Sequence, residues 1–150
     1  MMMKKPLELR LAQLAFPLFG SSAMRLLAHL GLCAAYLQGG LVKLTDFPGA
    51  VAEMTHFGLT PAPVFATLVI ALELIASVLI LAGRWRWLAA LVLAAFTLAA
   101  TLLALRFWEL PAGQERFFAA NSFFEHLGLV GGFLLVAWLD LREKLRDIPR

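Results

Sequence analysis

Glu73 is the residue whose type and position could do chemistry in this sequence. It lies in the apolar run Val64–Ala82, nine residues after the beginning of the run. In a transmembrane helix with a rise of about 1.5 Å per residue, this position falls near the middle of the bilayer. An acidic group there costs about 2.5 to 3.5 kcal/mol unless it is protonated, paired or turned toward a polar interior. We therefore expect Glu73 either to exchange protons or bind a ligand, or to fasten two helices by a hydrogen bond.

Partners for Glu73 are predicted from a polar stripe in the apolar run Leu26–Leu44. The stripe, with spacings of four, three, four and three residues, consists of His29, Cys33, Tyr36, Gly40 and Lys43. This spacing puts the five residues on one helix face. If the face is inside the bundle, Tyr36 and Lys43 can bind Glu73. In the alternative interpretation His29 and Lys43 lie near the two membrane interfaces and Cys33 fills a small space.

Two threonines and a glycine pair mark helix faces in the later part of the chain. Thr97 and Thr101 share a face of small residues, from which a hydroxyl can bond to its own helix or to a neighbour. Gly128 and Gly132 form a small-xxx-small face that permits close helix packing within the bundle or in a homo-oligomer.

Further polar residues are expected at the outer mouth of the bundle. Glu125 and His126 stand near the beginning of the fourth apolar run, and Lys43 and Arg106 are predicted at a similar level. These residues would form an outward-facing vestibule above Glu73. The residues expected to contact a ligand are Tyr36, Lys43, Thr97, Thr101, Glu125 and His126.

The elements that must position these side chains are four apolar runs. They are Leu26–Leu44, Val64–Ala82, Trp87–Leu105 and Asn121–Leu139. Each is close to the 20 or so residues that a helix needs to cross a hydrocarbon core of about 30 Å. The chain is 61% apolar and 15% charged, whereas soluble domains are about 45 to 50% apolar and about 25% charged. The sequence predicts an all-α integral membrane protein with a four-transmembrane-helix bundle.

Charge distribution predicts the topology. Ten Lys and Arg residues precede the first run, stand in the Arg84–Trp87 turn or follow the last run, and three, Lys43, Arg106 and Arg116, fall on the other side. The positive-inside rule then places both termini of this multi-pass chain, and the Arg84 turn, in the cytoplasm. The two longer loops, Thr45–Pro63 and Arg106–Ala120, face outward and leave room for a brief helix or a lid.

Three segments follow from this topology. Residues 1–25 form a cytoplasmic or interfacial N-terminal segment, residues 26–140 the membrane domain and residues 141–150 a basic tail. Leucines at positions 7, 11, 14 and 18 predict a short interfacial helix that Pro17 interrupts.

Several kinds of site are disfavoured. One cysteine allows no intrachain disulfide and no Cys-x-x-Cys pair, and the three histidines show no spacing typical of a metal or haem site. No phosphate loop, dinucleotide fingerprint or nucleophile elbow is present. Scattered juxtamembrane cations are a poor surface for nucleic acid and suit lipid headgroups instead.

An ordered set of motifs resembles the DoxX family of small four-helix inner-membrane proteins. The set comprises G-G-L-V-K-L at 39–44, D-F-P-G at 46–49, G-L-T-P-A-P at 58–63, Glu73 in mid-membrane, Gly83, N-S-F-F at 121–124 and G-G-F-L-L at 131–135. The resemblance covers about residues 25 to 140 and carries over Lys43 and Glu73 as pattern positions. It implies association with redox systems, because the family is named after a subunit of a thiosulfate:quinone oxidoreductase and other members resemble anchors of complexes with superoxide dismutase and a sulfurtransferase.

Two functions remain open at this stage. In the first, the chain is the membrane subunit or partner of a quinone, thiol, sulfur or oxidative-stress system, rather than a self-contained enzyme. A quinone, as a cofactor, or a small sulfur or thiol species would then enter between the helices, and Glu73 would take or give the accompanying proton. A soluble redox or sulfur-transfer enzyme is the expected partner. In the second, the chain is a non-catalytic membrane anchor or a small-solute carrier. The basic tail would then dock an acidic protein surface.

Overall fold

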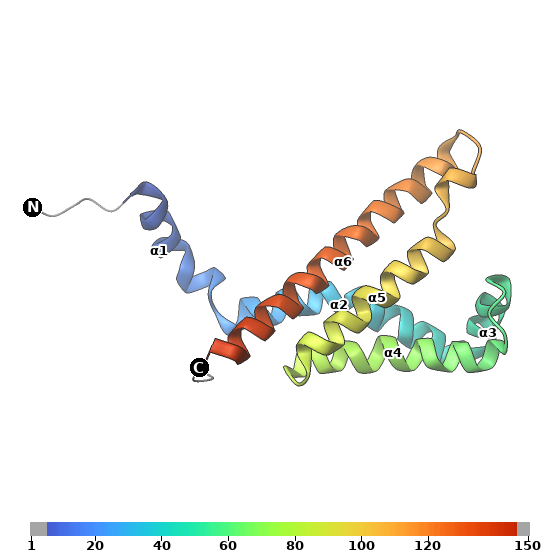
Figure 1. Cartoon of the computed structure of the whole chain (residues 1–150), viewed down its shortest axis with the longest axis horizontal. Helices are drawn as coiled ribbons and strands as arrows, with labels where there is room; N and C mark the ends of the chain where they lie inside the picture. Colours follow the sequence, from blue (N-terminus) through green and yellow to red (C-terminus); the bar gives the residue numbers. More distant parts are fainter. Residues whose placement is uncertain (1–5, 147–150) are drawn as a thin grey trace, which may run out of the picture.

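The computed structural model describes residues 6–146 and consists of helices over that range (Figure 1). The elements are α1 (Leu7–Phe19), α2 (Ser22–Thr45), α3 (Phe47–His56), α4 (Ala62–Ala82), α5 (Arg86–Ala104), the 3-10 turn η1 (Phe107–Glu109) and α6 (Gln114–Arg146). The predicted all-α fold is thereby confirmed. Lys4, Lys5 and Arg150, which contribute to the predicted charge asymmetry, lie outside the described residues.

Four of these helices, α2, α4, α5 and α6, are long and apolar enough to cross a membrane. They coincide with the four predicted runs, and the loops Thr45–Pro63 and Arg106–Ala120 contain the brief helices α3 and η1 for which they left room. The fourth run was predicted too short. α6 has 33 residues and is therefore about 50 Å long, because polar residues at both ends continue the helix beyond the apolar segment. Its last turns include residues 141–146 of the predicted tail.

The N-terminal helix also differs from its prediction. α1 continues through Pro17 and ends at Phe19. A proline removes one backbone hydrogen-bond donor. Because Pro17 lies close to the end of the helix, the loss of this donor affects only the last turn. None of the side chains of α1 is buried, and its leucines stay free to contact lipid.

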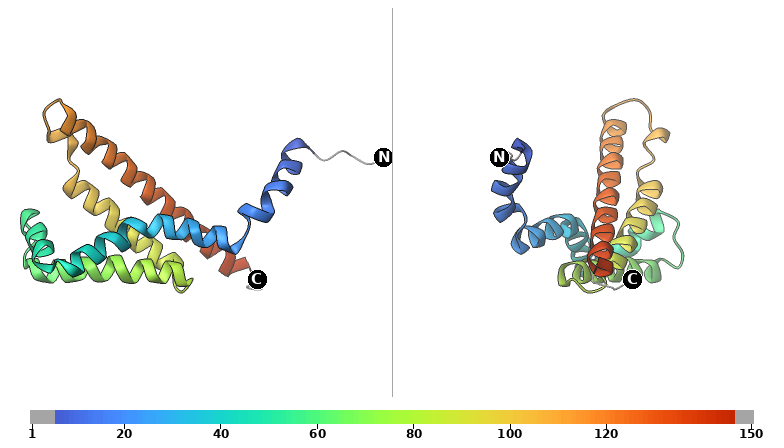
Figure 2. Two further views of the ribbon diagram at one scale, coloured as in Figure 1. Left: turned by 180° about the vertical axis from the view of Figure 1, so that it is seen from behind. Right: turned by 60° about the vertical axis from the view of Figure 1, so that its left-hand side comes forward.

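The spanning helices form two arms that meet at one end (Figures 1 and 2). The first arm consists of α2, α3 and α4, and the second of α5, η1 and α6, with α5 packed along α6. The backbones of the two arms approach each other at α4 with α5 and, over a shorter length, at α2 with α6. Within the described chain α3 makes no close backbone approach to α5 or α6. The arms therefore diverge from the Arg84 turn toward the ends that carry α3 and η1.

Asp140 ties the arms together where they meet. Its Oδ2 accepts a hydrogen bond from the backbone N–H of Trp87 at 3.2 Å, and its Oδ1 lies 3.5 Å from Nη1 of Arg86. Nε of Arg86 in turn donates to the carbonyl of Ile80 on α4 at 2.9 Å. The N-cap residue of α5, Trp85, has a left-handed backbone with φ 54° and provides no side-chain cap. A carboxylate from α6 therefore satisfies the first turn of α5.

Small residues allow close packing in both arms. The core around α5 contains Ala90, Leu93 and Ala94, and Phe133 of α6 closes it against Tyr36 with ring centroids 5.3 Å apart. Between α2 and α4 the close approach falls at Gly40, where a Cβ atom would lie 2.8 Å from the side chain of Leu74.

Gly40→Val is expected to destabilise the first arm, because the added side chain must push α4 away from α2. Overpacking of this kind costs about 1 to 3 kcal/mol. A lower melting temperature of the purified protein in mild detergent would report the loss. Gly31→Val is the matched control on the same helix, since a Cβ atom at Gly31 meets nothing within 4 Å. Equal melting temperatures for the two variants would contradict close packing at Gly40.

Candidate functional site

Lys43 and Glu73 form a buried ion pair between α2 and α4. Nζ of Lys43 donates to both carboxylate oxygens of Glu73 at 3.2 Å each. The side chains are 18% and 8% exposed, respectively. Gly39 leaves room for the pair, because a Cβ atom there would lie 3.4 Å from Nζ. The predicted contact of Lys43 with Glu73 is confirmed, and both oxygens of this carboxylate are engaged by one ammonium group.

Tyr36 has a different partner from the predicted one. Its hydroxyl lies 2.5 Å from Oγ1 of Thr97 on α5, and that Oγ1 donates its own proton to the carbonyl of Leu93 at 2.6 Å. The Tyr36 hydroxyl therefore donates to Thr97. Glu73 therefore has Lys43 and not Tyr36 as its partner, and Tyr36 joins the first arm to the second.

Thr101 and His126 form the corresponding tie within the second arm. Oγ1 of Thr101 donates to the carbonyl of Thr97 at 2.6 Å and lies 2.9 Å from Nδ1 of His126. Because this hydroxyl has one proton and the carbonyl takes it, Nδ1 must carry a hydrogen and donate to Oγ1. The hydroxyls of Thr97 and Thr101 are each bonded to a carbonyl and not to one another. These residues thus fasten helices at two levels and form no continuous proton path.

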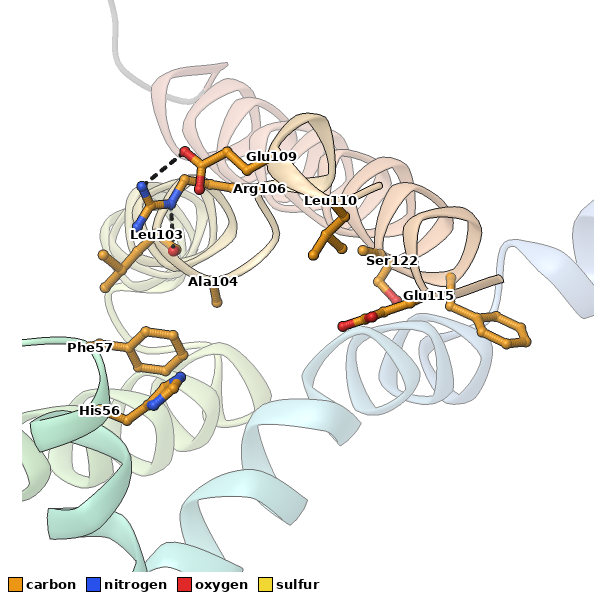
Figure 3. A pocket seen from close by; sticks show the side chains of 11 residues that line it. His56, Phe57, Leu103, Ala104, Arg106, Glu109, Leu110, Glu115 and Ser122 are labelled. Carbon is orange, nitrogen blue, oxygen red and sulfur yellow. Dashed lines mark hydrogen bonds and ion pairs between the residues drawn. The ribbon is translucent and has the colours of Figure 1, made fainter. Parts of the chain in front are cut away.

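A cavity of about 590 Å³ lies between the diverging ends of the arms (Figure 3). His56 and Phe57 face it from the end of α3, and Glu115 points into it from the first turn of α6. Arg106 and Glu109 stand at its rim, where they form an ion pair at 3.1 Å. The cavity therefore offers an imidazole beside Phe57 on one wall and a carboxylate on the other, with apolar side chains such as Ala104 and Leu110 in the rest of the lining.

The predicted vestibule is assembled from other residues. Of Lys43, Arg106, Glu125 and His126, the structure places only Arg106 in the lining of this cavity. Lys43 is paired deeper in the first arm, His126 bonds to Thr101, and Glu125 is exposed on α6.

The two glycines of α6 that were predicted to form one packing face, Gly128 and Gly132, have different surroundings. A Cβ atom at Gly132 would lie 3.0 Å from Leu32, so this glycine permits the contact of α6 with α2. A Cβ atom at Gly128 meets nothing within 4 Å, which leaves that position open to lipid or to another chain.

Sequence reasoning missed Asp140, Arg86 and Glu115. The sequence could have indicated Asp140, because an acidic residue at the end of an apolar run costs free energy unless it is paired. One partner, Lys144, is four residues away in the sequence, and the other, Arg86, is predicted at the same end of the bundle. Glu115 had none, since it belongs to a segment that was expected to be loop. The described residues contain no group of three His, Cys, Asp or Glu side chains that could hold a metal ion.

The fold and its buried polar ties define a multi-pass α-helical membrane protein. A family model described as DoxX matches residues 24–106, which is more than half of the chain, and the chain belongs to the DoxX family. No curated protein and no solved structure matches it. The matched residues include the ion pair, Tyr36 and both threonines, whereas the α6 wall of the cavity lies beyond them.

Lys43→Met is expected to destabilise the protein by about 3 to 5 kcal/mol, because it leaves the Glu73 carboxylate buried without a partner. The double variant Lys43→Met/Glu73→Met removes both charges and should recover most of the loss. Thermal unfolding in detergent measures both. A double variant as unstable as the single one would show that the pair does not fasten α2 to α4.

Proposed function

We propose that this DoxX family protein is the membrane subunit of a redox system and that a quinone binds in the cavity between the arms. The observation that carries the proposal is the placement of His56 and Glu115 on opposite walls of an open cavity with an aromatic lining. A membrane-soluble substrate can enter such a cleft from the side, because the arms diverge toward this end.

The chemistry of quinones fits this placement. Reduction adds two electrons and two protons, one proton to each of two carbonyl oxygens on opposite sides of the ring. Acid–base groups on both walls can serve the two oxygens, and Phe57 can pack on the ring face. His56 takes one oxygen and Glu115 the other. The electrons come from a soluble redox or sulfur-transfer enzyme that docks at the cavity end.

Glu73 has a positioning role in this proposal. Both of its oxygens accept from Lys43, and a carboxylate held in this way has no proton to give. The ion pair fastens α2 to α4 and takes no part in proton transfer to the quinone. The proposed setting is a bacterial inner membrane, with the Arg84 turn on the cytoplasmic side and the cavity outside, as the distribution of Lys and Arg indicates.

Removing either acid–base group should impair quinone chemistry with little effect on folding. His56→Gln and Glu115→Gln are each expected to lower quinone reduction in native membranes about 100-fold. Both should also weaken binding of a short-chain quinone, measured as quenching of tryptophan fluorescence in the purified protein.

Glu53→Gln is the matched control for these two variants, since Glu53 is exposed on α3 and does not line the cavity. The variant Lys43→Met/Glu73→Met should retain quinone reduction if it folds. Unchanged rates and unchanged binding in both cavity variants would overturn the proposal, and loss of activity in the folded double variant would return the proton-exchange role to Glu73.

A second candidate function is a non-catalytic anchor. It is favoured by the continuation of α6 to Arg146, which presents Arg142 and Arg146 on a helical extension. Cations of this extension can dock an acidic surface of a soluble protein.

The anchor function predicts that Arg142→Glu/Arg146→Glu abolishes co-purification of a stoichiometric soluble partner from native membranes. Mass spectrometry of the intact particle identifies what remains bound. A partner that is retained at unchanged stoichiometry would argue against docking by the end of α6.

A further inference from the structure

A second concave surface lies at the other end of the bundle, between the beginning of α2 and the end of α6. It is a groove of about 340 Å³ with a polar mouth formed by Arg25, His29 and Glu143. Its deeper walls are apolar and are formed by Leu32, Val136 and Leu139. The groove is separate from the cavity that faces α3, because the two share no residue.

The polarity of the groove changes along its length as it does along a phospholipid. On α2 the lining residues from the helix end inward are Arg25, His29 and Leu32, and on α6 they are Glu143, Leu139 and Val136. Seven residues of helix separate the first from the last on each side, which is about 10 Å, or about a third of a hydrocarbon core of about 30 Å. The groove therefore has the depth of a headgroup and the first part of an acyl chain.

The other two charged residues that line the groove, Arg86 and Asp140, are already satisfied within the protein. Asp140 accepts from the Trp87 N–H and pairs with Arg86 and with Lys144, the latter at 2.9 Å. Arg86 also donates to the carbonyl of Ile80. These groups hold the arms together and are not free to bind a ligand.

The mouth, in contrast, carries one cation and one anion that are accessible. Arg25 and Glu143 lie 3.3 Å apart, with side chains 54% and 59% exposed. An exposed pair of this kind is weak, so a ligand with both charges can replace it. Nδ1 of His29 lies 2.7 Å from the carbonyl of Arg25 and must donate to it, which leaves Nε2 as an acceptor in the neutral ring.

We propose that this groove binds one phospholipid with a phosphate and a primary ammonium group, as in phosphatidylethanolamine. The phosphate pairs with Arg25, the ammonium donates to Glu143 and to Nε2 of His29, and an acyl chain lies on Leu32, Val136 and Leu139. A purely anionic headgroup such as phosphatidylglycerol leaves Glu143 beside a second negative charge. The quaternary ammonium of phosphatidylcholine has no N–H to donate.

Native mass spectrometry of the full chain in mild detergent tests the proposal. The delipidated protein receives equimolar phosphatidylethanolamine, phosphatidylglycerol and phosphatidylcholine. One phosphatidylethanolamine should be retained at least tenfold over the other two. Arg25→Gln should remove this adduct, and Glu143→Gln should remove the preference over phosphatidylglycerol.

Arg84→Gln serves as the control, because Arg84 is an exposed cation at the same end of the bundle and does not line the groove. Soluble glycerophosphoethanolamine, which lacks acyl chains, should not displace the lipid. Equal retention of phosphatidylglycerol, equal loss in Arg84→Gln and Arg25→Gln, or displacement by the soluble headgroup would each overturn the proposal.

Discussion

Lipid offers a polar side chain no hydrogen bond, so every buried polar group in the membrane must find its partner in the protein. Three helix interfaces in the described part of the chain are each organised around one such requirement. Lys43 with Glu73 joins α2 to α4, Tyr36 with Thr97 joins α2 to α5, and Thr101 with His126 joins α5 to α6. The described residues contain one exception, Ser77, whose buried hydroxyl has no partner.

These ties explain how the arms can diverge without losing their internal order. Apolar packing alone gives helices in lipid little preference for one neighbour or one register, because lipid tails are as apolar as leucine. A hydrogen bond between two particular side chains fixes both the neighbouring helix and the register. The Asp140 carboxylate does this for α4, α5 and α6 together through Arg86 and the N–H of Trp87. The arms are thus fixed at one end and free to stand apart at the other.

The sequence predicted the helices and one tie but not the shape of the bundle. Helices follow from apolar runs of membrane length, and the pairing of Lys43 with Glu73 follows from helical spacing and the cost of a buried charge. The partner of Tyr36 could not be predicted in the same way, because it depends on how α5 rotates against α2. The divergence of the arms depends on the packing of side chains such as Leu32 on Gly132. Glu115 entered the cavity because α6 begins seven residues before the predicted run.

The two ties between the arms have a mechanical consequence. α5 has 19 residues; Asp140 holds its first turn, and Tyr36 holds Thr97 eleven residues further along. The last seven residues of α5, beyond Thr97, form a lever about 10 Å long. A tilt of about 10° at Thr97 moves the end of this lever by about 2 Å. The separation of His56 from the wall of α6 is therefore limited by ties at Thr97 and Asp140, which do not line the cavity themselves.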